Sequence, residues 1–78
     1  MCTWDIEVTD TFGEQANYAW VERSKLRVPD GISDLALVRR IKSVAGYSGI
    51  RGQTYVSGES VEIRFPGRCV VIFANVRH

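Results

Sequence analysis

The chain has almost no net charge, and this absence excludes the most strongly charged classes of protein. Its 10 Lys and Arg residues stand against 9 Asp and Glu residues, which gives a net charge of +1 at pH 7. A typical nucleic-acid-binding domain or acidic phosphate mimic carries a large excess of one sign. Nucleic acid is therefore not the partner that we favour.

Cysteine and histidine are also scarce, which argues against metal sites. There is no Cys-x-x-Cys pair, and the only histidine is the terminal His78, which we expect to be a frayed tail. Structural zinc sites need four Cys or His ligands at short spacings. We expect no metal and no cofactor, and we expect Cys2 and Cys69 to be free thiols, because two cysteines without an export signal seldom pair.

Long hydrophobic runs are missing as well. The longest, from Cys69 to Ala74, is far shorter than the roughly 20 residues that cross a bilayer. The N-terminal segment contains Asp5, Glu7 and Asp10 and no basic start followed by an apolar run, so it does not read as a secretory signal. We expect a single domain over residues 1–78, without membrane association and located in the cytoplasm.

No arrangement of residues points to catalysis. Neither cysteine has a histidine nearby in sequence to act as its base, apart from His78. A glycine-rich phosphate-binding loop precedes a helix, whereas Gly46, Gly49 and Gly52 follow the expected helix. Asp5 and Glu7 alternate on a strand beside basic residues, where carboxyl groups stay ionised. We expect a protein that is not an enzyme.

Hydrophobic periodicity predicts the secondary structure. Trp4, Ile6 and Val8 alternate with polar residues and predict a first strand, followed by a loop centred on Gly13 and a second strand over residues 18–28. The alternation breaks within the second strand, which suggests a bulge or a twisted edge. These two strands should form a hairpin.

The middle of the chain reads as one amphipathic helix. Ser33 can cap it, Gly46 can end it, and an apolar stripe runs along one side; the stripe consists of Leu37, Val38, Ile41, Val44 and Ala45. Three further strands are expected over residues 50–56, 61–65 and 69–76, with a type II turn at Pro66-Gly67. The prediction is an α+β fold, β-β-α-β-β-β, with one antiparallel sheet in the order 2-1-5-4-3 and the helix on one face.

Basic residues in the second strand admit two interpretations. If Trp4 pairs with Leu26, then Asp5 faces Lys25 and Glu7 faces Arg23, which gives stabilising cross-strand charge pairs. Alternatively, Arg23, Lys25 and Arg27 form a basic row that binds phosphates, with Tyr18 and Trp20 as stacking platforms. We favour the first interpretation, because exposed charges usually form a solvated face.

The aromatic residues outnumber those that one helix and one sheet can bury. We expect the core to contain at least three of the four residues Trp4, Trp20, Phe65 and Phe73. Phe12, by contrast, lies in a polar stretch. Exposed aromatics together with arginine are typical of the centre of an interface. The candidate partner-binding residues are Phe12, Tyr18, Trp20, Arg23, Lys25, Arg27, Arg39 and Arg40.

The last strand is apolar on both of its faces. One helix covers one side of a small sheet, so the other side needs a second cover: a loop, a second copy of the chain as a homodimer, or a partner.

Residues 4–13, Asn17-Tyr18-Ala19-Trp20-Val21 and Pro29-Asp30-Gly31 resemble a group of short uncharacterised proteins from proteobacterial phages, plasmids and genomic islands. The resemblance covers nearly the whole chain, although the group often has two glycines where this chain has Gly13-Glu14. Such small mobile-element proteins are similar in size and setting to anti-CRISPR proteins. The resemblance itself implies no activity. From the similarity in size and setting alone we expect a non-catalytic inhibitor that binds a host complex such as a CRISPR-Cas effector; the alternatives are a small nucleic-acid-binding accessory protein or a subunit of a phage or conjugation assembly.

Overall fold

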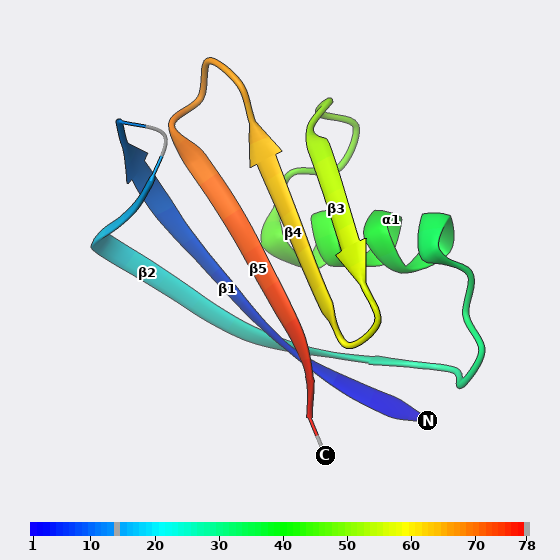
Figure 1. Cartoon of the computed structure of the whole chain (residues 1–78). Coiled ribbons are helices and arrows are strands. Elements are labelled where there is room, and N and C mark those ends of the chain that lie inside the picture. Colours follow the sequence, from blue (N-terminus) through cyan, green and yellow to red (C-terminus); the bar gives the residue numbers. More distant parts are fainter. Residues whose placement is uncertain (14, 78) are drawn as a thin grey trace.

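The computed structural model of the protein describes residues 1–13 and 15–77, so that the expected roles of Glu14 in a loop and His78 as a tail lie outside the described residues. One helix and one sheet make up the fold (Figure 1). The elements, in chain order, are β1 (Cys2–Phe12), β2 (Gln15–Val28), α1 (Asp34–Ala45), β3 (Gln53–Ser57), β4 (Ser60–Phe65) and β5 (Val70–Arg77).

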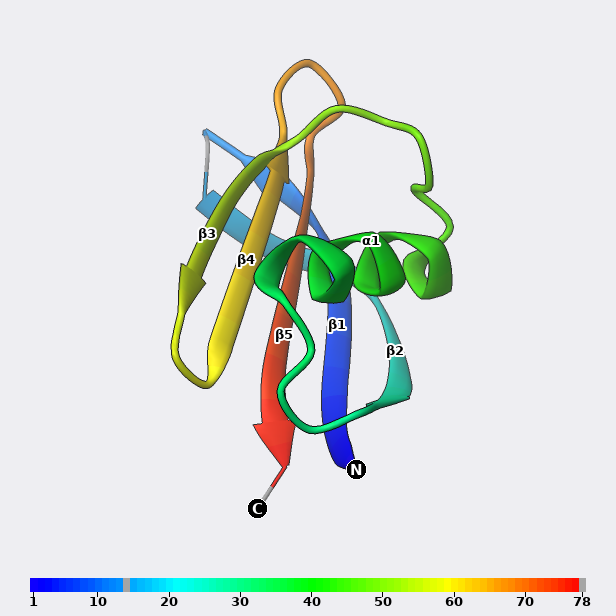
Figure 2. The same ribbon diagram turned by 90° about the vertical axis from the view of Figure 1, so that its right-hand side faces the viewer.

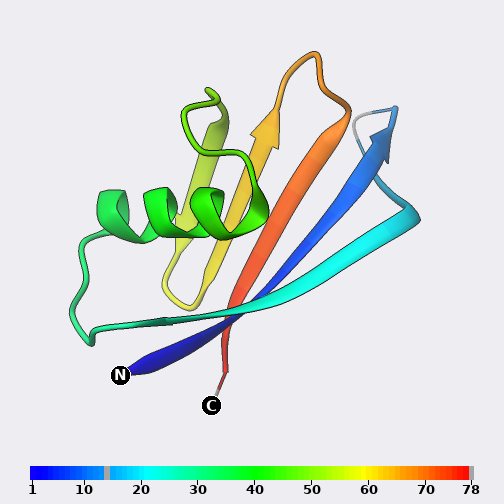
Figure 3. The ribbon, with the colours of Figure 1, turned by 180° about the vertical axis from the view of Figure 1, so that it is seen from behind.

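The predicted topology is confirmed. The sheet has the order β2-β1-β5-β4-β3, and every neighbouring pair of strands is antiparallel. The most apolar strands, β1 and β5, lie in the interior of the sheet, where both of their edges are hydrogen-bonded. Figures 2 and 3 show α1 lying across one face of the sheet, in front of the strands, and Figure 1, from the opposite side of the sheet to Figure 3, shows the other face with α1 behind the strands.

The helix begins and ends at the predicted residues. The Ser33 hydroxyl accepts a hydrogen bond from the Ala36 amide at 3.2 Å, and Gly46 adopts a left-handed conformation with φ 86°. Leu37 and Ile41 are buried against the sheet. The expected apolar stripe is wrong at Val44, which is 42% exposed, because the helix meets the sheet along a narrower strip than the sequence suggests.

A single core lies between α1 and the sheet. Tyr47, which follows the helix, stacks on Phe65 with 4.9 Å between the ring centroids, so this tyrosine packs against the core. Of the four expected core aromatics only Trp4 and Phe65 are in the buried cluster. The buried members are Trp4, Ile6, Val8, Val28, Leu37, Ile41, Val61, Ile63, Phe65, Val70, Ile72 and Ala74.

Several strand boundaries differ from the predictions. The expected loop around Gly13 is shorter, because β1 continues to Phe12 and β2 starts at Gln15. The third strand starts only at Gln53. The Pro66-Gly67 turn has the predicted form, since Gly67 has φ 83° and the Arg68 amide donates to the Phe65 carbonyl at 3.1 Å.

The helix-free face of β5 is covered in part by the chain itself. Val71 is completely buried there, between its cross-strand neighbours Thr9 and Arg64. Phe73 is half-buried on the same face, between Glu7 and Glu62. Phe73 is therefore the apolar side chain of β5 that remains partly exposed on this face, and the one that a second cover would bury.

Cys2 and Cys69 are far apart in this topology. The antiparallel pairing puts the start of β1 beside the end of β5, whereas Cys69 precedes β5 and its carbonyl accepts a hydrogen bond from the Thr11 amide at 2.9 Å. Both thiols are free. Within residues 1–13 and 15–77, no helix has the length and apolar character needed to cross a membrane.

Candidate interaction surface

The β1–β2 hairpin is irregular near its tip. Thr9 lies opposite Val21 and Thr11 opposite Ala16, so that residues 17–20 of β2 face the single residue Asp10. This is the bulge that the broken alternation of β2 suggested. Extra residues in one strand lose their regular ladder partners and need others.

Side chains of β1 supply those partners. The buried hydroxyl of Thr9 accepts a hydrogen bond from the Tyr18 amide at 3.0 Å and donates one to the Trp20 carbonyl at 3.1 Å. The Asp10 carboxylate accepts from the Ala19 amide and from the Asn17 side chain, both at 2.9 Å. These contacts hold Tyr18 at a positive φ of 57°. The sequence interpretation missed Thr9 and Asp10, since their spacing follows the ordinary alternation of a strand.

Asp10 gives the bulge a measurable pH dependence. The hydrogen bond from Asn17, helped by the one from Ala19, lowers the pKa of the Asp10 carboxyl below its usual value of 3.8. Because the pKa of Asp10 is lower in the folded chain than in the unfolded chain, its carboxylate stabilises the folded hairpin at pH values above the unfolded pKa. This contribution is lost as the pH falls through the folded pKa. We expect the NMR signal of the Ala19 amide to titrate with a midpoint below pH 3.8.

Asp10→Asn is the matched control, because it keeps the size of the side chain and removes the titrating group. Its Ala19 amide signal should not show this step. A midpoint at or above pH 3.8 in the wild type would contradict the assigned hydrogen bonds.

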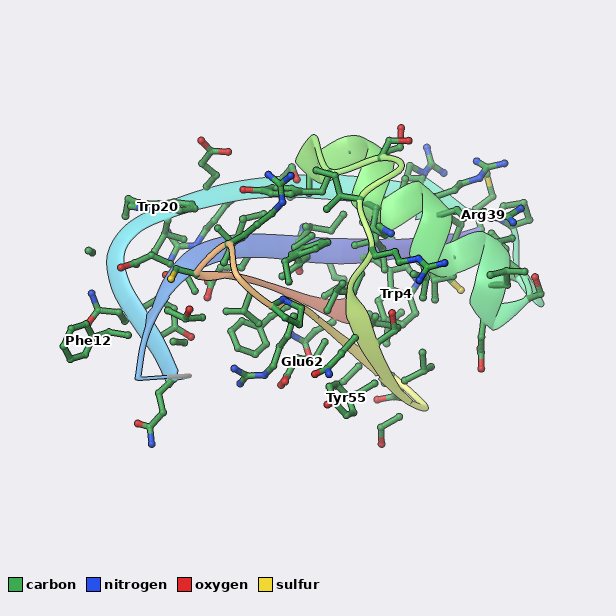
Figure 4. The ribbon with its side chains drawn as sticks, turned by 90° about the horizontal axis from the view of Figure 1, so that it is seen from above. Trp4, Phe12, Trp20, Arg39, Tyr55 and Glu62 are labelled. Carbon is green, nitrogen blue, oxygen red and sulfur yellow. The ribbon has the colours of Figure 1, made fainter. Side chains whose placement is uncertain are left out.

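Three of the predicted partner-binding residues are exposed aromatics near the tip of the β1–β2 hairpin, Phe12 at the end of β1 and Tyr18 and Trp20 in the bulge of β2, and we call them the hairpin aromatics. Their exposed fractions are 80%, 53% and 42% respectively. Figure 4 shows Phe12 and Trp20 at the same end of the molecule, with Phe12 pointing away from the fold. Exposed apolar surface of this kind costs free energy in water, which a partner would recover.

The basic row of β2, which consists of Arg23, Lys25 and Arg27, lies on the helix-free face and runs from Arg23 away from this tip. The predicted register is confirmed, with Asp5 opposite Lys25 and Glu7 opposite Arg23. Arg23 forms an ion pair with Glu7 at 3.3 Å. Asp5 instead pairs with Arg77 of β5 at 3.1 Å, so the expected bond to Lys25 is replaced by one from the neighbouring strand.

An open hollow of about 490 Å³ lies on this face, over β2, β1 and β5. Charged side chains of both signs line it together with Phe73. The sequence did not indicate the hollow, because its residues come from strands far apart in the chain. The lining residues are Asp5, Ile6, Glu7, Arg23, Ser24, Lys25, Phe73, Asn75 and Arg77.

The structure does not bring all of the predicted partner-binding residues together. Arg39 and Arg40 are exposed on α1, and Figure 4 shows Arg39 at the opposite end of the molecule from Phe12. The molecule is 35 Å long, so Arg39 and Arg40 form a surface that is separate from the hairpin tip. The basic row of β2 consists of Arg23, Lys25 and Arg27; Arg23, opposite Glu7, lies nearest to the hairpin aromatics, whereas Arg27, opposite Thr3, lies toward the other end of β1.

Cys2 is the thiol with a defined polar contact. Its sulfur donates a hydrogen bond to Asp30 Oδ1 at 2.8 Å. This bond raises the pKa of the Cys2 thiol, which keeps it protonated and weakly nucleophilic at neutral pH. Among the residues that the structure describes, no group of three His, Cys, Asp or Glu side chains is placed to hold a metal ion.

Comparison of the chain with protein-family models, with curated proteins and with solved structures finds no match.

Proposed function

We propose that the protein acts by binding a larger host protein complex through the tip of the β1–β2 hairpin. Phe12 carries this proposal, because a phenylalanine that is 80% exposed at the end of a strand contributes nothing to the core. The hydrogen bonds between the bulge and the side chains of Thr9 and Asp10 fix the bulge beside Phe12, so a partner would meet a surface that is already ordered. A preordered surface loses less conformational entropy on binding.

The partner that we propose is a CRISPR-Cas effector complex, which the protein would inhibit. The support for this class is the resemblance to small mobile-element proteins, together with a hairpin that exposes aromatic side chains at its tip and basic side chains along β2. Arg23, Lys25 and Arg27 lie on the strand that also carries Tyr18 and Trp20. Aromatic residues combined with arginine dominate the energetics of many protein interfaces.

The test is protection of a phage in a host that carries an active CRISPR system. We expect Phe12→Ala, and separately the double change Arg23→Ala and Arg27→Ala, to abolish protection, because truncating a central contact often costs about 2 kcal/mol or more. Circular dichroism should show an unchanged fold. Leu35→Ala is the matched control, since Leu35 is an exposed apolar residue, 63% accessible, on α1.

Full protection by all of these folded variants would show that the hairpin is not the functional surface. A loss of protection with Arg39→Ala and Arg40→Ala instead would assign the function to the helix. If the partner is nucleic acid, the affinity should fall steeply with salt concentration. Recovery of phage or conjugation proteins from a host lysate, without an effector complex, would favour an assembly subunit.

A further inference from the structure

The open sheet has two edges of opposite character. One edge is β2, which carries a bulge and basic residues at alternate positions. The other is β3, Gln53-Thr54-Tyr55-Val56-Ser57, in which every residue is exposed. A short length, charges, prolines and bulges are the features that normally keep an edge strand from pairing with another chain. β3 is short, but it contains no charge, proline or bulge, and its pairing with β4 is regular throughout.

From this contrast we propose that β3 pairs antiparallel with β3 of a second copy of the chain, giving a two-fold symmetric dimer with one continuous sheet. A two-fold axis through Tyr55 places Tyr55 opposite itself, Gln53 opposite Ser57 and Thr54 opposite Val56. This register uses the whole strand. It brings no like charges together.

The residues that flank β3 are complementary under the same symmetry. Arg51 precedes the strand and Glu59 follows it, in the turn to β4. An antiparallel arrangement brings Arg51 of one copy to the end of the seam where Glu59 of the other copy lies. The Glu59 turn is held by a hydrogen bond from the Val76 amide to the Glu59 carbonyl at 3.0 Å, so its position is fixed by the central sheet.

A corresponding pair of β2 strands centred on the basic row is unfavourable. A two-fold axis through Lys25 would place Lys25 opposite Lys25 and Arg23 opposite Arg27 on the same face. Like charges directly opposite each other destabilise a strand pair. The basic row therefore protects one edge, and the uncharged β3 is left as the edge for assembly (Figure 1).

The surface around β3 also favours a partner. Tyr55 is 55% exposed on the helix-free face, and Val56 is 36% exposed on the face of α1. Cross-strand aromatic pairs are among the stabilising contacts of antiparallel sheets. The proposal is independent of the proposed function, because β3 and the hairpin strand β2 lie at opposite edges of the sheet.

Sedimentation velocity over a range of protein concentrations tests the dimer. A short edge strand buries little area, so we expect a weak, reversible dimer that forms at micromolar to millimolar concentration. Tyr55→Lys and Tyr55→Glu should each raise the dissociation constant at least about tenfold, because each places two like charges in direct opposition. Circular dichroism should show both variants folded.

A mixture of Tyr55→Lys and Tyr55→Glu is the decisive sample. The symmetric register places the new lysine opposite the new glutamate, so the mixture should associate where each variant alone does not. Leu35→Lys is the matched control, since Leu35 is similarly exposed, at 63%, and lies on α1; it should dimerise like the wild type. A wild type that stays monomeric at all concentrations, a dimer that Tyr55→Lys leaves unchanged, or a mixture that fails to associate would each overturn the proposal.

Discussion

Ile41→Ala is expected to lower the free energy of unfolding by about 2 to 5 kcal/mol. Ile41 is completely buried at the centre of the face that α1 turns to the sheet, and truncation would leave a cavity there. A domain of this size rarely has more than roughly 3 to 5 kcal/mol to lose. Thermal or urea unfolding followed by circular dichroism measures the change.

Arg40→Ala is the control for Ile41→Ala. Arg40 precedes Ile41 on α1, and its side chain is exposed, so its loss should change stability by less than about 0.5 kcal/mol. Equal melting curves for Ile41→Ala and the wild type would mean that α1 does not pack as described.

Gly52→Ala should destabilise the fold by about 1 to 3 kcal/mol through overpacking. A methyl group at Gly52 would lie 2.9 Å from Cγ2 of Ile63, 3.0 Å from the backbone oxygen of Arg64 and 3.0 Å from Cε1 of Phe65. The backbone oxygen belongs to a strand inside the sheet and cannot move aside. The start of β3 would have to shift away from β4.

Ser48→Ala is a suitable control for Gly52→Ala. Ser48 also lies in the segment between α1 and β3 and is exposed, so the substitution removes a hydroxyl group that is accessible to solvent. Its unfolding curve should match the wild type. A Gly52→Ala protein as stable as the wild type would show that the connection into β3 is loosely packed. If the β3 dimer forms, both measurements should be made at a concentration where the chain is monomeric, since dimerisation would add stability to each.

The candidate site was predicted only in part. Phe12 stood out because an aromatic residue in a polar stretch has no core to join, and its exposure in the structure agrees. Asp10 and Thr9 did not stand out, because their role depends on which β2 residues fold back over them. The hollow beside Phe73 was missed for a related reason, since it forms where β5 joins the β1–β2 hairpin, which lies far from β5 in the chain.

Local patterns in the sequence determined the helix, its caps at Ser33 and Gly46 and the strand alternation of β1, whereas the pairing of Trp4 with Leu26 was an assumption that the structure confirms. These features depend on neighbouring residues and on the requirement that one face of each element be buried. The strand order also followed from the sequence, because the most apolar strands, β1 and β5, gain most from the interior of the sheet.

Tertiary structure alone decided which apolar side chains are covered. Val44 belongs to the helical stripe by periodicity, yet it is 42% exposed because α1 crosses a twisted sheet and touches it over a limited length. Val71 lies on the helix-free face and is nevertheless completely buried, because its cross-strand neighbours come from β1 and β4. Burial is a property of the assembled neighbours of a residue, and periodicity specifies only the side of the element on which the residue lies.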